Sequence, residues 1–397
     1  MIRHAVRASA LLAAAVLSLT ACGGGDTATP GATAHPVFSE PLARQVHLAL
    51  RHTQETGGAD FRQTVTFGAG KDTAVQDLTG RLDFAGSRGE AASRWSLTPG
   101  FPEDARETIL GTLPGRGTGD AAGRYTVDTR AIHYRPDSTA YWLRYEGDIE
   151  PLWGIDSISH LRGTEGAIGG TLLEVLSAVR PTAQPTTTDG GRSYRADFPL
   201  GAALDLFPYD LRTEFVSGPL HATDPSPPVP VTVDVDREGR IVRARADLSS
   251  LLSHEPDSLL AGVTTLRADL TLSRFGPPEP AVSATPDGRV LDAAGAVRPS
   301  YEVAAGACMD FNTGMRHSRL VTRVPCAGPH DGKVTGQHPL PGAYPGSEAA
   351  MDRAGRACAR TEGPGAPWYT WSTEDEWTDR GAGRATCYTV ATRRSAA

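Results

Sequence analysis

The distribution of cysteines is the feature that most restricts how this chain can fold. Four of its five cysteines, Cys308, Cys326, Cys358 and Cys387, lie in the C-terminal part of the 397 residues, and Cys22 lies near the start. An even set confined to a short stretch is typical of a disulfide framework in an exported protein, whereas in a cytosolic protein it more often binds metal or serves catalysis. Whether the four C-terminal cysteines form disulfides therefore depends on whether the protein is exported or stays in the cytosol.

The N-terminus indicates that the chain is exported. Residues 1–21 join basic Arg3 and Arg7 to an apolar run and end in small residues, which is the pattern of a signal peptide. The apolar run is too short to cross the ~30 Å hydrocarbon core of a bilayer. We therefore expect the four C-terminal cysteines to form disulfides.

The segment Leu19-Thr20-Ala21-Cys22 resembles a bacterial lipobox. The resemblance implies that a diacylglyceryl group, with chains such as palmitate, is attached to the sulfur of Cys22 and that the chain is cleaved before it. Two or three acyl chains on one residue hold a protein stably on a membrane. We expect a lipid-anchored protein on the extracytoplasmic face of the cell membrane; an ordinary secretory signal that ends at a cysteine is the alternative.

Proline and glycine content divides the rest of the chain into two domains. A chain of this length exceeds what one hydrophobic core usually serves. Residues 22–39 are rich in Gly, Thr and Pro and predict a flexible tether, and residues 276–299 predict a linker because they show no sustained periodicity. These segments leave a first domain at 40–275, which has no cysteine, and a second domain at 300–392.

Charge and motifs argue against several classes of function. The chain carries 39 Lys and Arg against 46 Asp and Glu, a net charge of −7, so it is not expected to bind nucleic acid. It contains no G-x-S-x-G elbow, no phosphate-binding loop and no G-x-G-x-x-G. We expect no enzyme activity and no cofactor, although a hydrolase built from dispersed residues around His330 and Asp331 stays open.

Hydrophobic periodicity in the first domain predicts helices and strands. Residues 41–58 place apolar side chains at helical spacing, and GGTLLEVLSAVRP predicts a second helix that Pro181 ends. FRQTVTF alternates between apolar and polar residues, and two strand pairs flank turns at 135–138 and 237–239. Consecutive hairpins with helices on one face predict an α+β fold on an antiparallel sheet.

This layout resembles the LppX/LprG-type lipoproteins of mycobacteria, which are similar to the LolA-type lipid carriers. The likeness covers residues 40–275 and rests on the lipobox and tether, the opening helix, the middle hairpin with Tyr134 and Trp142, the Leu-rich helix and the late PVTVDVDREGRIVRA pair. It implies a strongly curved antiparallel sheet, a half-barrel with helices on one face, around an apolar cavity for acyl chains of lipids or glycolipids. Such a site needs shape and apolar walls rather than a charged catalyst.

The residues expected to line this cavity are those predicted to face inward from the sheet and the second helix. They are Trp95, Tyr134, Trp142, Leu172, Leu176 and Val179. The alternative for each is that it fills an ordinary core. The chain departs from the family in an acidic, proline-rich insertion at residues 210–228, which we expect to cap or obstruct the mouth of the cavity.

The second domain resembles the septum-formation domain of actinobacterial membrane proteins and lipoproteins. The likeness covers residues 300–391 and rests on a Gly-x-Cys opening, the Val-Pro-Cys strand, Pro-His-Asp before a Val strand, a Tyr-Pro-Gly turn and a terminal Cys-Tyr. It implies a small disulfide-stabilised α+β domain and supplies no reaction. We expect this domain to contact an envelope partner.

Four cysteines allow three disulfide pairings. We expect Cys308 to pair with Cys326 and Cys358 with Cys387, because adjacent hairpin strands bring the first two together. On the chain-entropy model each bridge would contribute ~3–4 kcal/mol to the stability of the domain.

A zinc site is the alternative use of the histidines in the second domain. Its ligands would be Cys326, His330, Asp331 and His338. The spacing contains neither CxxC nor HExxH, and oxidation outside the membrane removes the thiolate that zinc requires. Because proline precedes and glycine follows His330-Asp331, this pair predicts a turn and no metal.

The sequence therefore predicts a cell-surface lipoprotein that binds or carries the acyl chains of a lipid or glycolipid in an apolar cavity, with a C-terminal domain for envelope interactions. The alternative is an envelope scaffold or sensor lipoprotein whose cores are solid and which binds no lipid. The partners expected are the membrane, reached through the N-terminal lipid anchor, and the lipid ligand.

Overall fold

The structure is a computed structural model. It describes residues 35–113, 117–118, 122–146, 161–163, 167–212, 214–215, 228–253, 257–283, 285–314, 319–362 and 368–391. The predicted signal peptide, Cys22 and most of the tether lie outside these residues, as does most of the 210–228 insertion. The chain from His35 to Ala397 forms one compact unit. Among the described helices, none combines the length and apolar character needed to cross a membrane.

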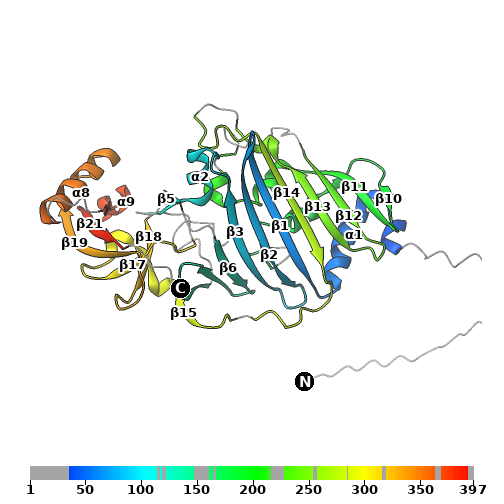
Figure 1. Cartoon of the computed structure of the whole chain (residues 1–397), viewed down its shortest axis with the longest axis horizontal. Helices are drawn as coiled ribbons and strands as arrows, with labels where there is room; N and C mark the ends of the chain where they lie inside the picture. Colours follow the sequence, from blue (N-terminus) through cyan, green and yellow to red (C-terminus); the bar gives the residue numbers. More distant parts are fainter. Residues whose placement is uncertain are drawn as a thin grey trace, which may run out of the picture. The chain divides into compact units, whose positions relative to one another are not determined.

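A large open sheet dominates the first domain (Figure 1). Its strands follow the order β10-β11-β12-β13-β14-β1-β2-β3-β6-β7-β8-β15, with β9 paired to β11, and all pairs are antiparallel except β15 with β8. The sheet is curved and does not close, because its edge strands β10 and β15 do not pair with each other. The curved antiparallel sheet predicted from the sequence is confirmed. The strands are β1 (Gly58–Ala69), β2 (Asp72–Asp83), β3 (Arg88–Leu97), β6 (Ala122–Val127), β7 (Ala131–Pro136), β8 (Tyr141–Glu146), β9 (Arg180–Pro181), β10 (Thr186–Thr188), β11 (Gly191–Phe198), β12 (Val229–Val235), β13 (Ile241–Asp247), β14 (Thr265–Ser273) and β15 (Arg289–Asp292).

Helix α1 (Leu42–Glu55) covers one face of this sheet, which we call the inner face. Its buried residues Val46, Ala49, Leu50 and Thr53 recur at helical spacing, and α1 contacts β1 and β13. The helix ends at Gly57, whose φ of +92° suits a glycine and whose N–H donates to the carbonyl of Gln54 at 3.1 Å. The sequence predicted this helix and its end.

The second predicted helix is shorter than expected. It consists of α4 (Leu172–Val175) and a 3-10 turn, η3 (Leu176–Ala178). Val179 is already extended, with φ −71° and ψ 136°, because the chain continues into β9, which pairs with β11. α4 contacts β13 and β14, so it also lies over the inner face. Further helices of the first domain are α2 (Glu103–Leu110), α5 (Leu200–Leu204) and α6 (Tyr209–Arg212).

The middle of the sheet contains one more turn than the sequence indicated. The predicted hairpin at 135–138 is present as β7 and β8, but YTVDTRAIHY is itself a hairpin of β6 and β7. Asp128 closes it, since its Oδ1 accepts hydrogen bonds of 2.7 Å from the N–H groups of Arg130 and Ala131. The turn lacks the glycine or proline that usually announces one. The predicted late hairpin is also present, with Gly239 at a φ of +78°.

A second, six-stranded sheet forms the C-terminal α+β part, in the order β16-β18-β17-β19-β21-β20. The predicted disulfides are both present, Cys308–Cys326 between β17 and the turn after β18, and Cys358–Cys387 between α8 and β21. The strands are β16 (Val297–Pro299), β17 (Cys308–Asp310), β18 (Leu320–Val324), β19 (Gly332–Leu340), β20 (Trp368–Trp371) and β21 (Gly383–Val390), and the helices include α8 (Ser347–Glu362) and α9 (Glu374–Arg380).

Much of the segment predicted as a linker has regular structure. Residues 276–299 include β15, which extends the first sheet, then α7 (Ala293–Ala296), and β16, which begins the second sheet. The part before β15 lies along the first sheet, where the Nε1 of Trp142 donates to the carbonyl of Asp287 at 3.1 Å and Arg81 donates to the carbonyl of Pro280 at 2.9 Å. Hydrogen bonds to the sheet therefore hold this segment in place, although its sequence shows no periodicity.

Three tyrosine hydroxyls connect the first sheet to the end of β17 and the loop that follows it. They share one face of β7 and β8, and each donates to a different residue. The bonds run from Tyr134 to Asn312 Oδ1 (3.3 Å), from Tyr141 to Asp310 Oδ2 (2.6 Å) and from Tyr145 to the carbonyl of Thr313 (2.5 Å). Burial raises the pKa of the Tyr145 hydroxyl, so it stays protonated as a donor. These bonds hold the two sheets together within one compact unit.

Candidate functional site

The inner face of the first sheet is apolar over most of its width. On β1 the inward side chains include Phe61, Val65 and Phe67, and on β2 their cross-strand neighbours include Ala74 and Leu78. The alternate residues point to the other face, which we call the outer face and which is polar. Ion pairs line that face, among them Arg62–Asp77 (2.7 Å) and Arg245–Asp234 (2.9 Å). This division follows from the two-residue period of a strand.

Two polar side chains on the inner side fix the helices that cover it. Gln63, between Phe61 and Val65 in the inward series, accepts from the N–H of Leu172 at 2.7 Å and donates to the carbonyl of Gly170 at 2.9 Å. Its amide thus satisfies the free backbone groups at the start of α4. On α1, the buried hydroxyl of Thr53 accepts from the N–H of Ile241 at 2.9 Å. The role of Gln63 was not predicted, although this residue is the polar exception in an apolar alternation.

The predicted wall residues lie at three places. Leu172, Leu176 and Val179 belong to α4, η3 and the residue that follows, and the first two have no solvent-exposed surface (0%). In this structure they therefore pack directly against their neighbours. Tyr134 lies on the inner face of β7, with its ring 5.1 Å from that of Tyr125. It is 6% exposed and lies at the connection to the second sheet.

Trp95 marks a third place, where aromatic rings gather on the inner side of β1 and β3. Its ring centroid lies 6.1 Å from that of Phe67, which is 6.3 Å from Phe207, and Phe207 is 4.6 Å from Phe215. Trp95 is only partly buried and packs against the core. Phe207 precedes the 210–228 insertion and Phe215 lies in its first part, so this cluster joins the sheet to the start of the insertion.

Trp142 lies on the outer face, not on the inner wall on which we expected it. In the β7–β8 ladder Tyr134 is opposite Leu143, so the residue before Leu143 points to the other side. Its ring lies under the guanidinium of Arg135, whose Cζ is 5.2 Å from the ring centroid. Of the six predicted wall residues, the structure brings five to the inner side, at three separate places, and leaves Trp142 out.

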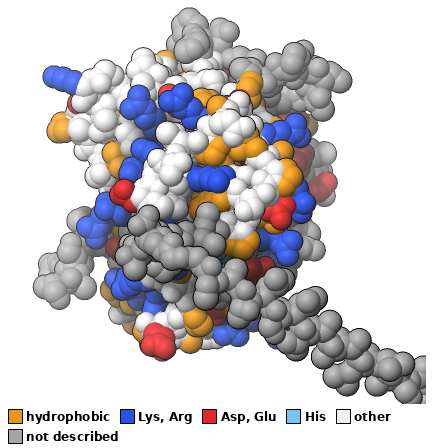
Figure 2. All heavy atoms as spheres, turned by 90° about the vertical axis from the view of Figure 1, so that its right-hand side faces the viewer, with side chains coloured by type: hydrophobic (Ala, Val, Ile, Leu, Met, Phe, Trp, Pro, Cys, Tyr) orange, Lys and Arg blue, Asp and Glu red, His pale blue; other side chains and the backbone are white. Residues whose placement is uncertain are grey.

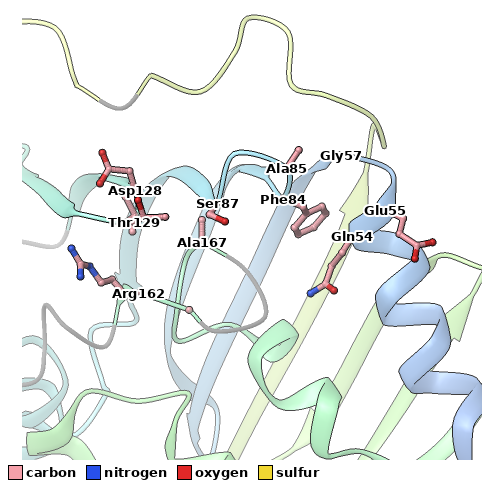
Figure 3. Close-up of a pocket in the computed structure, with 12 residues that line it drawn as sticks. Gln54, Glu55, Gly57, Phe84, Ala85, Ser87, Asp128, Thr129, Arg162 and Ala167 are labelled. Carbon is pink, nitrogen blue, oxygen red and sulfur yellow. The ribbon is translucent and has the colours of Figure 1, made fainter. Parts of the chain in front are cut away.

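A pocket of about 680 Å³ lies at one end of the sheet, next to the C-terminal end of α1 (Figure 3). Gln54 of α1, Phe84, Asp128 and Arg162 border it from four different segments. The Nε and Nη2 atoms of Arg162 are buried and make no hydrogen bond with any residue that the structure describes. The pocket is bordered by polar and apolar groups alike, unlike the apolar inner face beside it.

Hydrophobic side chains also reach the surface on the side viewed in Figure 2. They gather there among Lys and Arg side chains, and Asp and Glu side chains are fewer on that view. Apolar surface rimmed by charge is a feature of surfaces that contact ligands, membranes or other proteins.

The residues of the zinc alternative serve other purposes. Cys326 is in a disulfide, and the Nδ1 of His330 lies 2.9 Å from the carbonyl of Gly328 in a turn. Asp331 is buried, and its Oδ2 accepts from the N–H of Phe311 at 2.9 Å. In the described ranges, no three His, Cys, Asp or Glu side chains are close enough together to hold a metal ion.

Comparison with known proteins gives distant likenesses of fold. No protein-family model matches the chain, and no curated protein matches it. Among solved structures, LprF from Mycobacterium bovis is 14% identical, with a TM-score of 0.32 over 63% of this chain and 98% of that chain. The Mycobacterium tuberculosis lipoprotein LppX is 16% identical, with a TM-score of 0.30 over 60% of this chain and 96% of that chain. The MucA/MucB complex of Pseudomonas aeruginosa is 12% identical, with a TM-score of 0.22 over 88% and 94%. At these TM-scores we draw no functional conclusion from the likenesses.

Proposed function

We propose that this chain is a cell-envelope lipoprotein, anchored through Cys22, whose first domain binds the acyl chains of a lipid or glycolipid on the inner face of its sheet. The observation that carries the proposal is the extent of the apolar inner face on a sheet that stays open at both edges. Acyl chains need apolar walls of suitable shape and no charged catalyst, so the proposed role is binding or transport without turnover.

Of the elements that cover this face, α4 and η3 are short enough to move. α4 has four residues and η3 has three, and such short helices have little stability of their own in water. Their apolar side chains pack against the sheet, and two hydrogen bonds to Gln63 attach the start of α4 to β1. Because Leu172 and Leu176 fill the space beneath, an acyl chain would enter by displacing them.

The proposed wall comprises the five inward residues Trp95, Tyr134, Leu172, Leu176 and Val179. Trp95 and the rings near it form the most accessible part of this wall, since Trp95 is partly exposed to solvent and the other four residues are buried. We place the entry of the ligand at this aromatic cluster. Aromatic side chains offer large apolar contact areas at low cost in conformational entropy.

A matched pair of variants on β3 tests the proposal. Ser93 is 6% exposed and on the inner face, two residues from Trp95, whereas Ser96 is exposed on the outer face of the same strand. Ser93→Phe should fill inner space and weaken the binding of a fluorescent fatty-acyl probe at least fivefold, and Ser96→Phe should leave it within twofold. Circular dichroism and thermal unfolding verify the fold, with Ser93→Leu as the milder substitute. Equal binding by all variants, or no saturable binding by the wild type, would overturn the proposal.

A scaffold or sensor without a lipid ligand is the second candidate. The complete burial of Leu172 and Leu176 favours it, because a solid core needs no cargo. The two candidates differ in what Leu176→Ala does. A lipid carrier gains space and binds the acyl probe at least as well as the wild type, whereas a solid core only loses about 2–5 kcal/mol of stability.

A further inference from the structure

Trp142, which lies on the outer face of the first sheet and not on the expected inner wall, borders a second pocket. The pocket has a volume of about 500 Å³ and lies between strands β2, β3, β6, β7 and β8 and the segment before β15. Among the residues that border it are Arg124, Arg135, Trp142, Glu90 and Asp287. It lies on the opposite side of the sheet from the proposed lipid-binding face, so it does not depend on the proposed function.

Two arginines stand side by side in this pocket. Arg124 of β6 and Arg135 of β7 are directly opposite each other in the antiparallel ladder. Such cross-strand neighbours have their Cβ atoms about 5 Å apart, and like charges there destabilise the pair. The sheet therefore holds two positive charges together where folding alone would favour one charge of each sign.

The guanidinium of Arg135 is oriented by an aromatic ring and makes no ion pair with the residues that the structure describes. It lies over the ring of Trp142, and the Trp142 ring is in turn fixed by its hydrogen bond to the carbonyl of Asp287. The Nε of Arg135 is buried and finds no hydrogen-bond partner in the described part of the chain. A buried, unsatisfied donor of a charged group is costly unless a ligand accepts from it.

The acidic groups nearby leave this charge largely uncompensated. Glu90 accepts a hydrogen bond of 2.7 Å from Arg81, so its charge is already paired. Asp137 lies 3.9 Å from the Nε of Arg124, and both side chains are about half exposed, which makes the pair weak. Asp287 is exposed, and the contact it makes with Trp142 is through its carbonyl.

We propose that Arg124 and Arg135, with Trp142 beneath, form a binding site for a phosphoryl group. Guanidinium groups bind phosphate oxygens through paired hydrogen bonds, and two of them together attract either the dianion of inorganic phosphate or the monoanion of a phosphodiester. A volume of about 500 Å³ is in the range of small-molecule sites and leaves room for the group to which the phosphate is attached. The phosphoryl group comes either from the headgroup of a phospholipid or from free phosphate.

Calorimetric titration of the full-length protein with two soluble probes tests this site. Inorganic phosphate represents the free anion, and glycerophosphoinositol represents a phospholipid headgroup. At least one probe should bind at a single saturable site, and its affinity should fall as salt rises. Tighter binding of glycerophosphoinositol identifies a headgroup site, and equal or tighter binding of phosphate identifies an anion site; either result supports the proposal.

Substitutions locate the binding and can overturn it. Arg135→Gln should weaken binding at least tenfold, and Arg124→Gln, at an exposed position that should not affect folding, at least threefold. Arg94→Gln is the matched control, because Arg94 is an exposed arginine on the outer face of β3 outside the pocket. It should change binding less than twofold. The proposal is wrong if neither probe binds saturably, or if Arg135→Gln and Arg124→Gln bind as the wild type does.

Discussion

Gln63 shows how a single polar residue organises the inner face. It occupies an apolar series on β1, yet its side-chain amide is satisfied at both ends, by the N–H of Leu172 and the carbonyl of Gly170. A buried amide is tolerated only when it is paired in this way. The residue therefore couples the start of α4 to the centre of the sheet.

Replacing Gln63 with alanine should destabilise the protein. The change removes the hydrogen bonds to the buried N–H of Leu172 and to the partly buried carbonyl of Gly170, at a cost of about 1–3 kcal/mol. Urea unfolding followed by circular dichroism measures the loss. Gln76→Ala on β2 is the control, since it removes one bond of 3.2 Å to the hydroxyl of Ser93 and should cost less. A Gln63→Ala variant as stable as the Gln76→Ala variant would contradict this account of α4.

Single residues also mark the limit of prediction from sequence. Cys308 was expected to pair with Cys326 because adjacent strands bring them together, and Cys358 was then expected to pair with Cys387; the structure confirms both disulfides. The side on which Trp142 lies did not follow from the sequence, because it depends on register. With Tyr134 opposite Leu143, a difference of one residue moves Trp142 to the other face. Local sequence does not fix a cross-strand register of this kind.

At the scale of elements, hydrophobic periodicity predicted the long helix and the long strands. It did not predict the element ends and strand pairings that depend on tertiary contacts. The amphipathic spacing of α1 and the alternation of β1 are long enough to be unambiguous. The helix expected over 172–179 ends after the four residues of α4. The chain then continues through a 3-10 turn into β9, which pairs with β11. The arginine pair at 124 and 135 was hidden for the same reason, since only strand pairing makes the two neighbours.

The β6–β7 turn gives a prediction about local stability. Asp128 replaces the usual turn residues by accepting from two backbone N–H groups at 2.7 Å. Asp128→Ala should therefore cost about 1 kcal/mol and speed hydrogen exchange in β6 and β7. Asp128→Asn keeps an acceptor oxygen and should have a smaller effect. Unchanged exchange in both variants would show that the strands, and not the aspartate, determine this turn.

At the scale of the molecule, the two sheets form one unit because tyrosines join them. Tyr141 and Tyr145 donate from β8 to Asp310 at the end of β17 and to Thr313 in the loop after it. The linker expected at 276–299 instead adds β15 to the first sheet and β16 to the second. A conformational change in the first sheet should therefore also change the conformation of the second.

Removing the two hydroxyls should uncouple the sheets. Tyr141→Phe with Tyr145→Phe removes two buried hydrogen bonds between the sheets, each of which contributes about 1 kcal/mol. We expect a single thermal transition to broaden or split, and proteolysis between the sheets to accelerate. Tyr125→Phe is the control, because it removes a tyrosine hydroxyl from the same face without touching these bonds. A double variant that unfolds like this control would mean that apolar packing alone joins the sheets.

Solvent extraction of the full-length protein, purified from a host that contains membranes, followed by mass spectrometry, tests the central claim most directly. The account predicts acyl lipid in a reproducible molar ratio to protein, lost in Ser93→Phe and retained in Ser96→Phe. Reproducible absence of copurified acyl lipid, or the same amount from both variants, would contradict it.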